Sequence, residues 1–544
     1  MKAARISLAV LIFLLIVFMG GCAEKENLPE DPKPLVGFAE LIKAYQDGKV
    51  FESAEHQSGS CMLTFVDGHR LTIPSSSFEI YDCTERKPAK VEAVNGWWSI
   101  DGVILGVEAD SSIPDEDSMP IYVYFDARTL YAHLSNRSLL TFPSKVLEDE
   151  KNRQEEIARR QNIPVIRIQT MGSAPILDKE NYVDGTITIS DPEKLYSDIA
   201  EVTLDMGIRG RGNSTWSFPK KPWKVKLDEK ASILGMPADK EWCLLANYAD
   251  RTLLRNIVAM KISEICGFSW TPRMASVEVY LNGRYQGVYT FCEHKKISKD
   301  RVNLDIDAGD CYLEIEQQQD ETTCWWTGMG VPMMFSDPEE PSDAQLSYIK
   351  KYFSDFEASL YSPDFSDPQA GYAAYIDVES FIDYFIVQEL AKNTDGNLRK
   401  SSFITKEVGK KMEMYHLWDF DLTFGNNGWF LHEPEGYWVK DYAPDCNPGD
   451  NWFNRMFRDP VFADKVRKRW NELLPQLETI PDFIDEQALY LDKAKERNFQ
   501  VWSIWESVDW VNCPSLGSYE KEVDFFKDFY TKRLNWLTDD LNKL

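Results

Sequence analysis

The sequence predicts an α+β protein with more than one domain, and three observations support this. Short runs of alternating apolar and polar residues, separated by turn residues, recur up to about residue 145. Later in the chain, and throughout the part beyond residue 460, apolar residues recur at helical spacing. Strands first and mostly helices later is the order typical of the α+β class. The 544 residues also exceed what one hydrophobic core usually supports.

The N-terminus has the pattern of a secretory signal. Two basic residues precede an uncharged run over 6–21, rich in Leu, Ile, Val and Phe, which is too short for a durable membrane span. The run ends in Met-Gly-Gly-Cys at 19–22, which resembles a bacterial lipobox. That resemblance implies a lipoprotein signal peptide at 1–21 and lipidation of Cys22. Residues 22–34 are polar and proline-rich, so we expect them to be a tether.

These features predict an extracytoplasmic lipoprotein that is attached to a membrane through Cys22. The acidic residues directly after the cysteine resemble surface-export signals of some Gram-negative lipoproteins, so we expect the outer membrane or the cell surface. The formal net charge is −28, which argues against non-specific binding to nucleic acid or anionic lipid. We therefore predict no nucleic-acid partner.

The cysteines predict no metal centre. There are ten, and Cys22 leaves nine, so at least one thiol stays unpaired. An extracytoplasmic location permits disulfides, and Cys61 with Cys83 is the first pair to consider because both lie in one β-rich region. No cysteine spacing matches a zinc site.

Residues 35–145 predict a small all-β module. Runs at 61–66 and 70–73 flank Asp67-Gly68, which is a hairpin signal. Further strands are expected at 78–82, 97–100, 103–107, 121–125 and 129–134. The module has no cluster of catalytic side chains, so a role as spacer or binding module is expected. Residues 146–162 are charged and favour a helix, which predicts a linker helix between the module and the main domain.

The main domain is expected to begin with a strand at 163–169. A helix is predicted over 252–266, with Asp250 as N-cap and Gly267 as the stop. A hairpin follows around Asn282-Gly283, a strong turn signal between two alternating runs. The later expected elements are strands at 310–316, 401–405 and 412–417, and helices at 342–360, 377–392 and beyond 460.

The segment Ile208–Trp216 reads Ile-Arg-Gly-Arg-Gly-Asn-Ser-Thr-Trp, and we call it the glycine loop. Its glycines permit close approach of the backbone to a ligand, its arginines bring positive charge, and its Asn, Ser and Thr add donors. The strand that follows, Trp223–Leu227, puts Lys224 and Lys226 on one face. A phosphate site is one interpretation. A tight turn with surface salt bridges, next to an edge strand with solvated lysines, is the other.

Two further stretches carry carboxylates. Asp419 and Asp421 would point the same way in an extended segment, which suits Mg²⁺ or Mn²⁺, although the pair might instead cap a turn or bind arginine. Asp395 lies in a loop after the 377–392 helix, 24 residues before Asp419. A loop carboxylate that takes a hydroxyl proton, followed by a metal-binding Asp, is the arrangement of protein kinases. The alternative is a simple turn rich in Asn, Asp and Gly.

Four runs in order resemble the CotH (spore coat protein H) kinase family. They are RGRGNSTWSFPKKPWKVKL, EWCLLANYADRTLLRNIVAMKI, EVYLNGRYQGVYTFCEHKKI and WDFDLTFGN. The resemblance covers about residues 163–475, and 476–544 is expected to be a C-terminal helical extension of that domain. It implies an atypical, secreted protein-kinase-like fold that transfers phosphate from ATP to protein Ser/Thr hydroxyls with Mg²⁺ or Mn²⁺. The protein substrate is unknown.

The resemblance also implies roles for single residues. Asp395 would be the catalytic-loop Asp, Asp419 the metal-binding Asp, and Asn397 and Asp421 further metal or substrate ligands. The glycine loop would cover the phosphates. The expected nucleotide contacts are Arg209, Arg211, Asn213, Ser214, Lys221 or Lys224, Glu314 and Glu316 at a hinge, and Arg255 as a second anionic contact or a structural anchor.

The chain departs from ordinary kinases at several positions. Asn393-Thr394 stand before Asp395 where kinases have His-Arg, and Lys400 stands at the position of the kinase asparagine. A catalytically silent, kinase-like surface lipoprotein that binds glycan or a protein partner is therefore the alternative function. The 17 tryptophans, including Trp325-Trp326 and Trp429, would supply stacking surfaces for a glycan.

Overall fold

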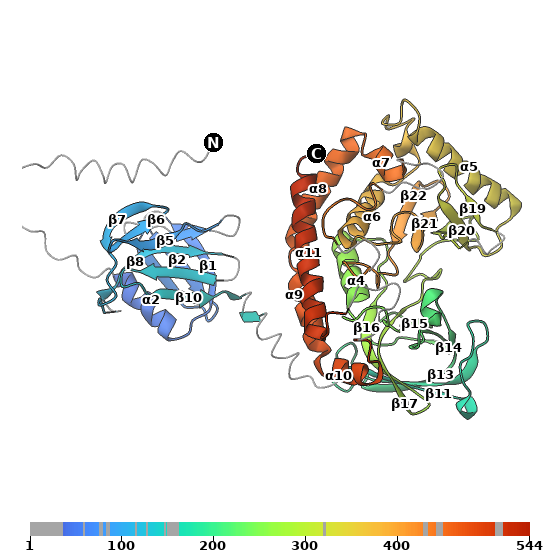
Figure 1. Ribbon diagram of the computed structural model, residues 1–544, viewed down its shortest axis with the longest axis horizontal. Coiled ribbons are helices and arrows are strands. Elements are labelled where there is room, and N and C mark those ends of the chain that lie inside the picture. The colour runs from blue at the N-terminus through green and yellow to red at the C-terminus, as the bar shows by residue number, and fades with distance from the viewer. Residues whose placement is uncertain are drawn as a thin grey trace, which may run out of the picture. The chain divides into compact units, whose positions relative to one another are not determined.

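The structure is a computed structural model that divides into two compact units, Met1–Glu155 and Glu156–Leu544 (Figure 1). It describes residues 36–57, 60–74, 80–82, 87–114, 117–126, 129–145, 148–149, 163–318, 323–427, 433–441, 450–505 and 515–544. The predicted signal peptide, Cys22, the tether, nearly all of the predicted linker helix, Cys83 and Trp429 lie outside these residues. Of the helices in the described part of the chain, none is long and apolar enough to span a bilayer.

The first unit is not all-β, because it begins with a helix. Helix α2 (Val36–Gln46) buries Leu41, Ile42 and Ala44 against strands β3 and β10. Three small sheets have the orders β1-β2-β3, β10-β9-β8-β4 and β5-β6-β7. Their strands are β1 (Phe51–Gln57), β2 (Ser60–Phe65), β3 (Arg70–Pro74), β4 (Ile80–Asp82), β5 (Val91–Val94), β6 (Trp97–Ile100), β7 (Val103–Glu108), β8 (Pro120–Phe125), β9 (Thr129–Leu134) and β10 (Leu139–Pro143). The expected strands are thus confirmed, and the helix was missed.

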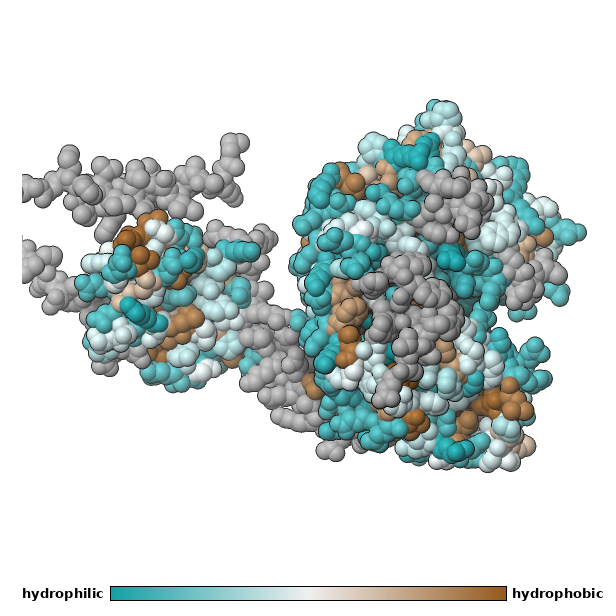
Figure 2. Space-filling view, viewed as in Figure 1, coloured by the Kyte–Doolittle hydropathy of each residue, from teal (hydrophilic) through white to brown (hydrophobic). Residues whose placement is uncertain are grey.

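Apolar side chains of the first unit are distributed unevenly. Phe65, Leu71 and Phe142 are buried in one core, where Cys61 is a buried free thiol. Val103 and Ile104 of β7 are instead more than half exposed, and Figure 2 shows apolar surface where β6 and β7 lie. In the same view the second unit is mostly hydrophilic.

The second unit begins with a closed barrel of seven strands in the order β11-β12-β13-β14-β15-β17-β16. Its bounds are β11 (Val165–Thr170), β12 (Val183–Ser190), β13 (Glu201–Gly210), β14 (Trp223–Ala231), β15 (Asp239–Leu245), β16 (Met274–Leu281) and β17 (Arg284–Glu293). Alternation puts Ile166, Ile208, Val225 and Trp242 into the barrel core. The barrel closes through β11, which pairs parallel with β16.

A hairpin and a helix show how local sequence positions the barrel. Asn282 and Gly283 both have positive φ (49° and 76°) and join β16 to β17, so the predicted hairpin is confirmed. Helix α4 (Arg255–Cys266) ends at Gly267 with φ 75°, as expected, but it begins three residues later than predicted. Asp250 is not its N-cap. The Asp250 carboxylate accepts from the backbone N–H of Arg255 (2.8 Å) and from its guanidinium.

The rest of the second unit is a five-stranded sheet with helices packed against it and against each other. The sheet has the order β19-β20-β18-β21-β22. Its strands are β18 (Cys311–Ile315), β19 (Trp325–Trp326), β20 (Pro332–Asp337), β21 (Ser402–Lys406) and β22 (Met412–His416). The helices are α5 (Asp343–Leu360), α6 (Val378–Ala391), α7 (Trp452–Met456), α8 (Pro460–Leu477), α9 (Ile480–Tyr490), α10 (Asp492–Val501) and α11 (Tyr519–Leu541). The α+β assignment is confirmed.

The C-terminal helices contact both parts of this unit. Helix α11 packs on α6, α8 and α9, whereas α10 lies against strand β17 of the barrel (Figure 1). Asn498 of α10 accepts a hydrogen bond from the backbone N–H of Val288 (3.0 Å), and Arg497 pairs with Glu278 (2.7 Å). The last helices therefore connect the barrel to the helical part.

Candidate functional site

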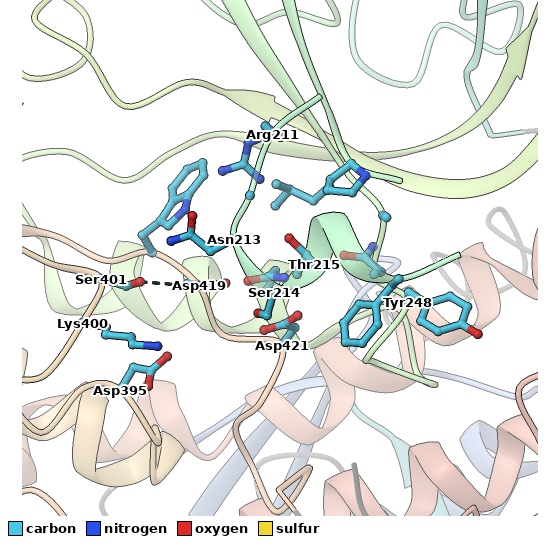
Figure 3. A pocket seen from close by; sticks show the side chains of 18 of the residues that line it. Arg211, Asn213, Ser214, Thr215, Tyr248, Asp395, Lys400, Ser401, Asp419 and Asp421 are labelled. Carbon is cyan, nitrogen blue, oxygen red and sulfur yellow. Dashed lines mark hydrogen bonds between the residues drawn. The ribbon is translucent and has the colours of Figure 1, made fainter. Parts of the chain in front are cut away.

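A cavity of about 220 Å³ lies where the barrel meets the sheet and helices (Figure 3). Its walls come from the glycine loop, the end of β15, the end of β18 and the loops after α6 and β22. The lining side chains that carry charge or hydrogen-bonding groups are Arg211, Asn213, Ser214, Thr215, Lys220, Asn247, Tyr248, Asn256, Lys295, Glu314, Glu316, Asp395, Lys400, Ser401, Trp418, Asp419 and Asp421. A hollow of about 680 Å³ adjoins it and shares Asn213, Lys295, Glu314 and Glu316.

The glycine loop forms one wall through a tight backbone. Gly212 has φ 82°, and a Cβ there would lie 2.1 Å from the Thr215 hydroxyl oxygen, so a side chain does not fit. The turn presents Asn213, Ser214 and Thr215 to the cavity, with Ser214 beside Asp421 (Figure 3). The loop thus places its hydroxyl and amide groups at one ligand-sized space.

Arg211 and Arg209 differ in position. Arg211 lines the cavity, with its guanidinium carbon 5.6 Å from the Trp418 ring centroid. Arg209 does not line it. Its neighbour Ile208 points into the barrel core, so Arg209 lies on the opposite face of β13, over the Tyr182 ring at 5.1 Å.

The two lysines predicted to meet phosphate are occupied elsewhere. Lys221 donates to the Trp216 carbonyl (2.6 Å) and does not line the cavity. Lys224 lines the adjoining hollow and pairs with Glu241 (2.6 Å). Neither reaches the carboxylates that line the 220 Å³ cavity.

Three other lysines, Lys220, Lys295 and Lys400, line the cavity, and none of them was predicted to do so. Lys220 is almost completely buried; its ammonium donates to the Val288 carbonyl and to Asn498 Oδ1 (2.9 Å), and burial lowers its pKa well below the usual range. Lys295 donates to Glu314, and its ammonium lies 4.2 Å from the Phe403 ring centroid. Lys295 stands near the end of one of the four runs that resemble the family, but nothing in Glu-His-Lys-Lys distinguishes it from Lys296.

Three aspartates from two loops line the same cavity. Asp395 follows α6, which ends at Lys392 with a left-handed φ of 47°. Burial raises the pKa of Asp395, and the charge of Asp419 raises it further. The pKa of Asp421 is raised well above its usual range, first by burial and then by Asp419, Asp250 and Asp395. Burial and the proximity of the three carboxyl groups therefore disfavour their simultaneous ionisation.

The Asp-Phe-Asp segment is not extended as predicted. Asp419 has φ 70°, and it accepts a hydrogen bond from the Ser401 hydroxyl at 3.3 Å. Phe420 turns inward, and its N–H donates to Asn256 of α4 (2.8 Å). A turn thus replaces strand alternation, yet both carboxylates still line the cavity. Non-glycine residues with positive φ gather here, which is common at functional sites; they are Asn247, Leu398, Ser401, Asp419 and Phe424.

The oxygen donors fit a hard divalent cation that also binds phosphate. No cluster of three His, Cys, Asp or Glu in the described part of the chain could enclose a metal by itself. Mg²⁺, however, is commonly held by one or two carboxylates together with substrate phosphates and water. Asp419 and Asp421 meet that requirement. Asn397 does not line the cavity, but its side-chain amide is buried and both of its polar atoms lack a hydrogen-bond partner.

The remaining predicted residues fall into two groups. Glu314 and Glu316 line both the cavity and the adjoining hollow, and burial raises the pKa of Glu316. Arg255 is buried and does not line the cavity. It pairs with Asp250 and donates to the Thr423 carbonyl (2.9 Å), so it is a structural anchor that ties α4 to the loop after Asp421.

Comparison with known proteins identifies one family. The sequence profile described as CotH kinase protein matches residues 208–537, from the first residue of the glycine loop into α11. Every cavity-lining residue named above lies inside this range. No curated protein matches the chain.

Proposed function

The chain belongs to the CotH kinase family, and from this premise we propose that it is a metal-dependent protein kinase. In this proposal the cavity binds the phosphates of ATP, and the terminal phosphoryl group passes to a Ser or Thr hydroxyl of another protein. The observation that carries the proposal is the arrangement of the cavity. It has the glycine loop on one side, three aspartates on the other and the Lys295–Glu314 pair between the cavity and the adjoining hollow.

The cavity and the adjoining hollow together suit the size of a nucleotide better than either space does alone. Small-molecule sites usually have volumes of about 300–1,000 Å³, and the cavity alone is below that range. The adjoining hollow adds space next to Glu314 and Glu316, with Tyr312 and Phe335 in its wall. We therefore place the phosphates in the cavity and the nucleoside in the hollow.

The donors on the phosphate side are those of the glycine loop and two cations. Asn213, Ser214 and Thr215 would donate to phosphate oxygens, while Arg211 and Lys295 would neutralise their charge. This assignment replaces Lys221 and Lys224 by Lys295. Such fixed donors favour a transition state in which charge spreads over the phosphoryl oxygens.

The carboxylates have separate roles in this scheme. Asp395 would accept the proton of the attacking hydroxyl, which requires its ionised form. Asp419 and Asp421 would hold Mg²⁺ or Mn²⁺, whereas Asn397, the further ligand that was predicted, does not line the cavity and has no role in this scheme. The cation would neutralise the phosphate charge when bound. Burial and then the neighbouring carboxylates raise the pKa of Asp421, so its ionised form would need a bound cation beside it.

The test is phosphoryl transfer by purified residues 23–544 with labelled ATP and Mg²⁺ or Mn²⁺. Autophosphorylation and nucleotide binding are expected for the wild type, and Asp395→Asn should lose at least about 100-fold of the transfer rate. Asp355→Asn is the matched control, because Asp355 lies on the exposed face of α5 and pairs with Lys351 outside the cavity. A wild type that neither binds ATP nor transfers phosphate would overturn the proposal.

The cellular setting is part of the proposal. The signal-like N-terminus and the Met-Gly-Gly-Cys motif support an exported lipoprotein held at a membrane through Cys22. Metabolic labelling with a fatty acid, compared with the Cys22→Ala variant, tests the anchor. Label that persists in the variant would refute it.

The alternative, a silent protein that binds glycan, depends on exposed tryptophans. Among the described tryptophans, Trp326 is 54% exposed and Trp97 is 39% exposed. Trp325 packs against Phe335 and Phe353. Within the described residues, each unit therefore has a single exposed tryptophan, so neither unit pairs two such rings, and the kinase is the function that the site supports best.

A further inference from the structure

We propose that Lys400 contacts the terminal phosphate of the nucleotide. The inference rests on the proposed kinase function and assigns one more phosphate-binding residue to the same cavity. Lys400 lines that cavity, and Figure 3 shows its ammonium directed toward Asp395, on the side opposite the glycine loop. The sequence marks it only as a departure, since ordinary kinases have asparagine there.

The backbone between Asp395 and Lys400 bends so that the two side chains meet. The N–H groups of Arg399 and Lys400 both donate to the Asp395 carbonyl at 3.3 Å. Leu398 and Ser401, on either side of these residues, have φ of 64° and 48°. Such angles are unfavourable for residues other than glycine, and the half-buried Lys400 side chain between them lines the cavity.

The Lys400 ammonium is uncommitted, unlike its lysine neighbours. Lys220 is bonded to Val288 and Asn498, and Lys295 is bonded to Glu314. Lys400 has neither a hydrogen bond from its ammonium nor an ion pair with any residue that the structure describes. A half-buried cation without a partner in a ligand cavity is available to an anion from outside the protein.

The charges around Lys400 indicate which anion fits. Burial raises the pKa values of both Asp395 and Glu316, and the charge of Lys400 opposes that rise, so Lys400 lies in the field of these two carboxylates. Asp395 is where the accepting hydroxyl is expected, so an ammonium that faces it is next to the phosphate that is transferred. Lysine acts as a flexible point charge, which suits a phosphoryl group whose charge is spread over three oxygens.

The experiment compares a non-hydrolysable ATP analogue with ADP, by titration calorimetry on residues 23–544 with Mg²⁺. Lys400→Met should lower the affinity for the analogue by about 10- to 100-fold, the range expected for one charge-assisted hydrogen bond, and that for ADP by less than about 3-fold. Lys400→Arg should retain the affinity for the analogue to within about 3-fold. Lys410→Met is the control, because Lys410 is exposed and pairs with Glu407 outside the cavity.

The outcomes separate this inference from the function on which it rests. If Lys400→Met weakens the analogue and ADP equally, or weakens neither, Lys400 does not contact the terminal phosphate. If the wild type binds neither nucleotide, the kinase proposal itself fails. Circular dichroism and the melting temperature show whether each variant folds, and Lys400→Gln repeats the test with a polar side chain if the methionine variant does not.

Discussion

Replacing Arg533 by methionine is expected to lower the free energy of unfolding of the second unit by about 3–5 kcal/mol. Arg533 of α11 and Glu389 of α6 form an ion pair of 2.6 Å in which both side chains are at most 1% exposed. Glu389 precedes the Asp395 loop by six residues, so this pair joins the C-terminal helix to the support of the site.

The magnitude follows from what would be left behind. Besides Arg533, the Glu389 carboxylate accepts the backbone N–H groups of Trp438, Val439 and Lys440 at 2.6–3.1 Å. These bonds remain in the variant, but the buried charge loses its counter-ion, which is the costly case for an ion pair. At about 2 °C per kcal/mol for a large domain, the melting temperature should fall by about 6–10 °C.

The assay is urea unfolding of residues 23–544, followed by the far-ultraviolet signal, for Arg533→Met, Glu389→Gln and the double variant. The double variant should lose clearly less than the sum of the two single losses, because no uncompensated charge remains. Lys465→Met breaks an exposed pair with Glu379 and should cost less than about 1 kcal/mol. Single losses below about 1 kcal/mol, or strictly additive losses, would refute this account of the pair.

Three further results are expected. As the pH is lowered, the transfer rate should begin to fall at a higher pH than the pKa of an ordinary Asp would give, because burial and Asp419 raise the pKa of Asp395. A transfer rate that stays constant down to about pH 4 contradicts this prediction. Because the pKa of Asp421 is raised in the folded state, the free energy of unfolding falls as the pH rises through that pKa. Mg²⁺ should therefore raise the melting temperature more at about pH 8 than at about pH 5.5. The Asp421→Asn variant should not show this difference. Gly212→Ala should lower the free energy of unfolding by about 1–3 kcal/mol and weaken ATP binding. Gly409 has a similar φ of 76° but open space around it, so Gly409→Ala should add only backbone strain and leave ATP binding unchanged. Thermal denaturation measures the stability of each variant, and ATP titration measures its binding.

Local chemistry made much of the fold predictable. Asn282-Gly283 is sufficient for its hairpin, and Gly267 ends α4 where periodicity indicated. The α2 helix was missed because Val36–Gln46 lies just after a proline-rich stretch and was read as part of a β module. Closure of the barrel through β11 and β16 joins segments more than 100 residues apart, and no local pattern encodes such a pairing.

The sequence predicted which loops and aspartates form the site, but not which lysine side chains line it. The glycine loop, Asp395 and the Asp419–Asp421 pair meet at one cavity, as their order along the chain suggested. The lysines could not be ranked, because their surroundings are set by distant partners. Lys220 donates a hydrogen bond to Asn498, which is 278 residues away in sequence. The φ of 70° at Asp419 likewise depends on tertiary packing, which overrides the alternation of an isolated segment.

The attachment of α10 to the barrel has a consequence for the order of folding. Lys220 and Val288 obtain their Asn498 partner only after nearly the whole chain has been made, since Asn498 lies 46 residues before the C-terminus of the 544-residue chain. A chain that stops short of α10 would contain the whole barrel and all three cavity aspartates, but it would leave the buried Lys220 ammonium without the Asn498 acceptor. Completion of the site is therefore a late, long-range event. Truncation from the C-terminal end removes first Arg533 of α11, the partner of Glu389 near the Asp395 loop, and then Asn498 of α10, the partner of Lys220.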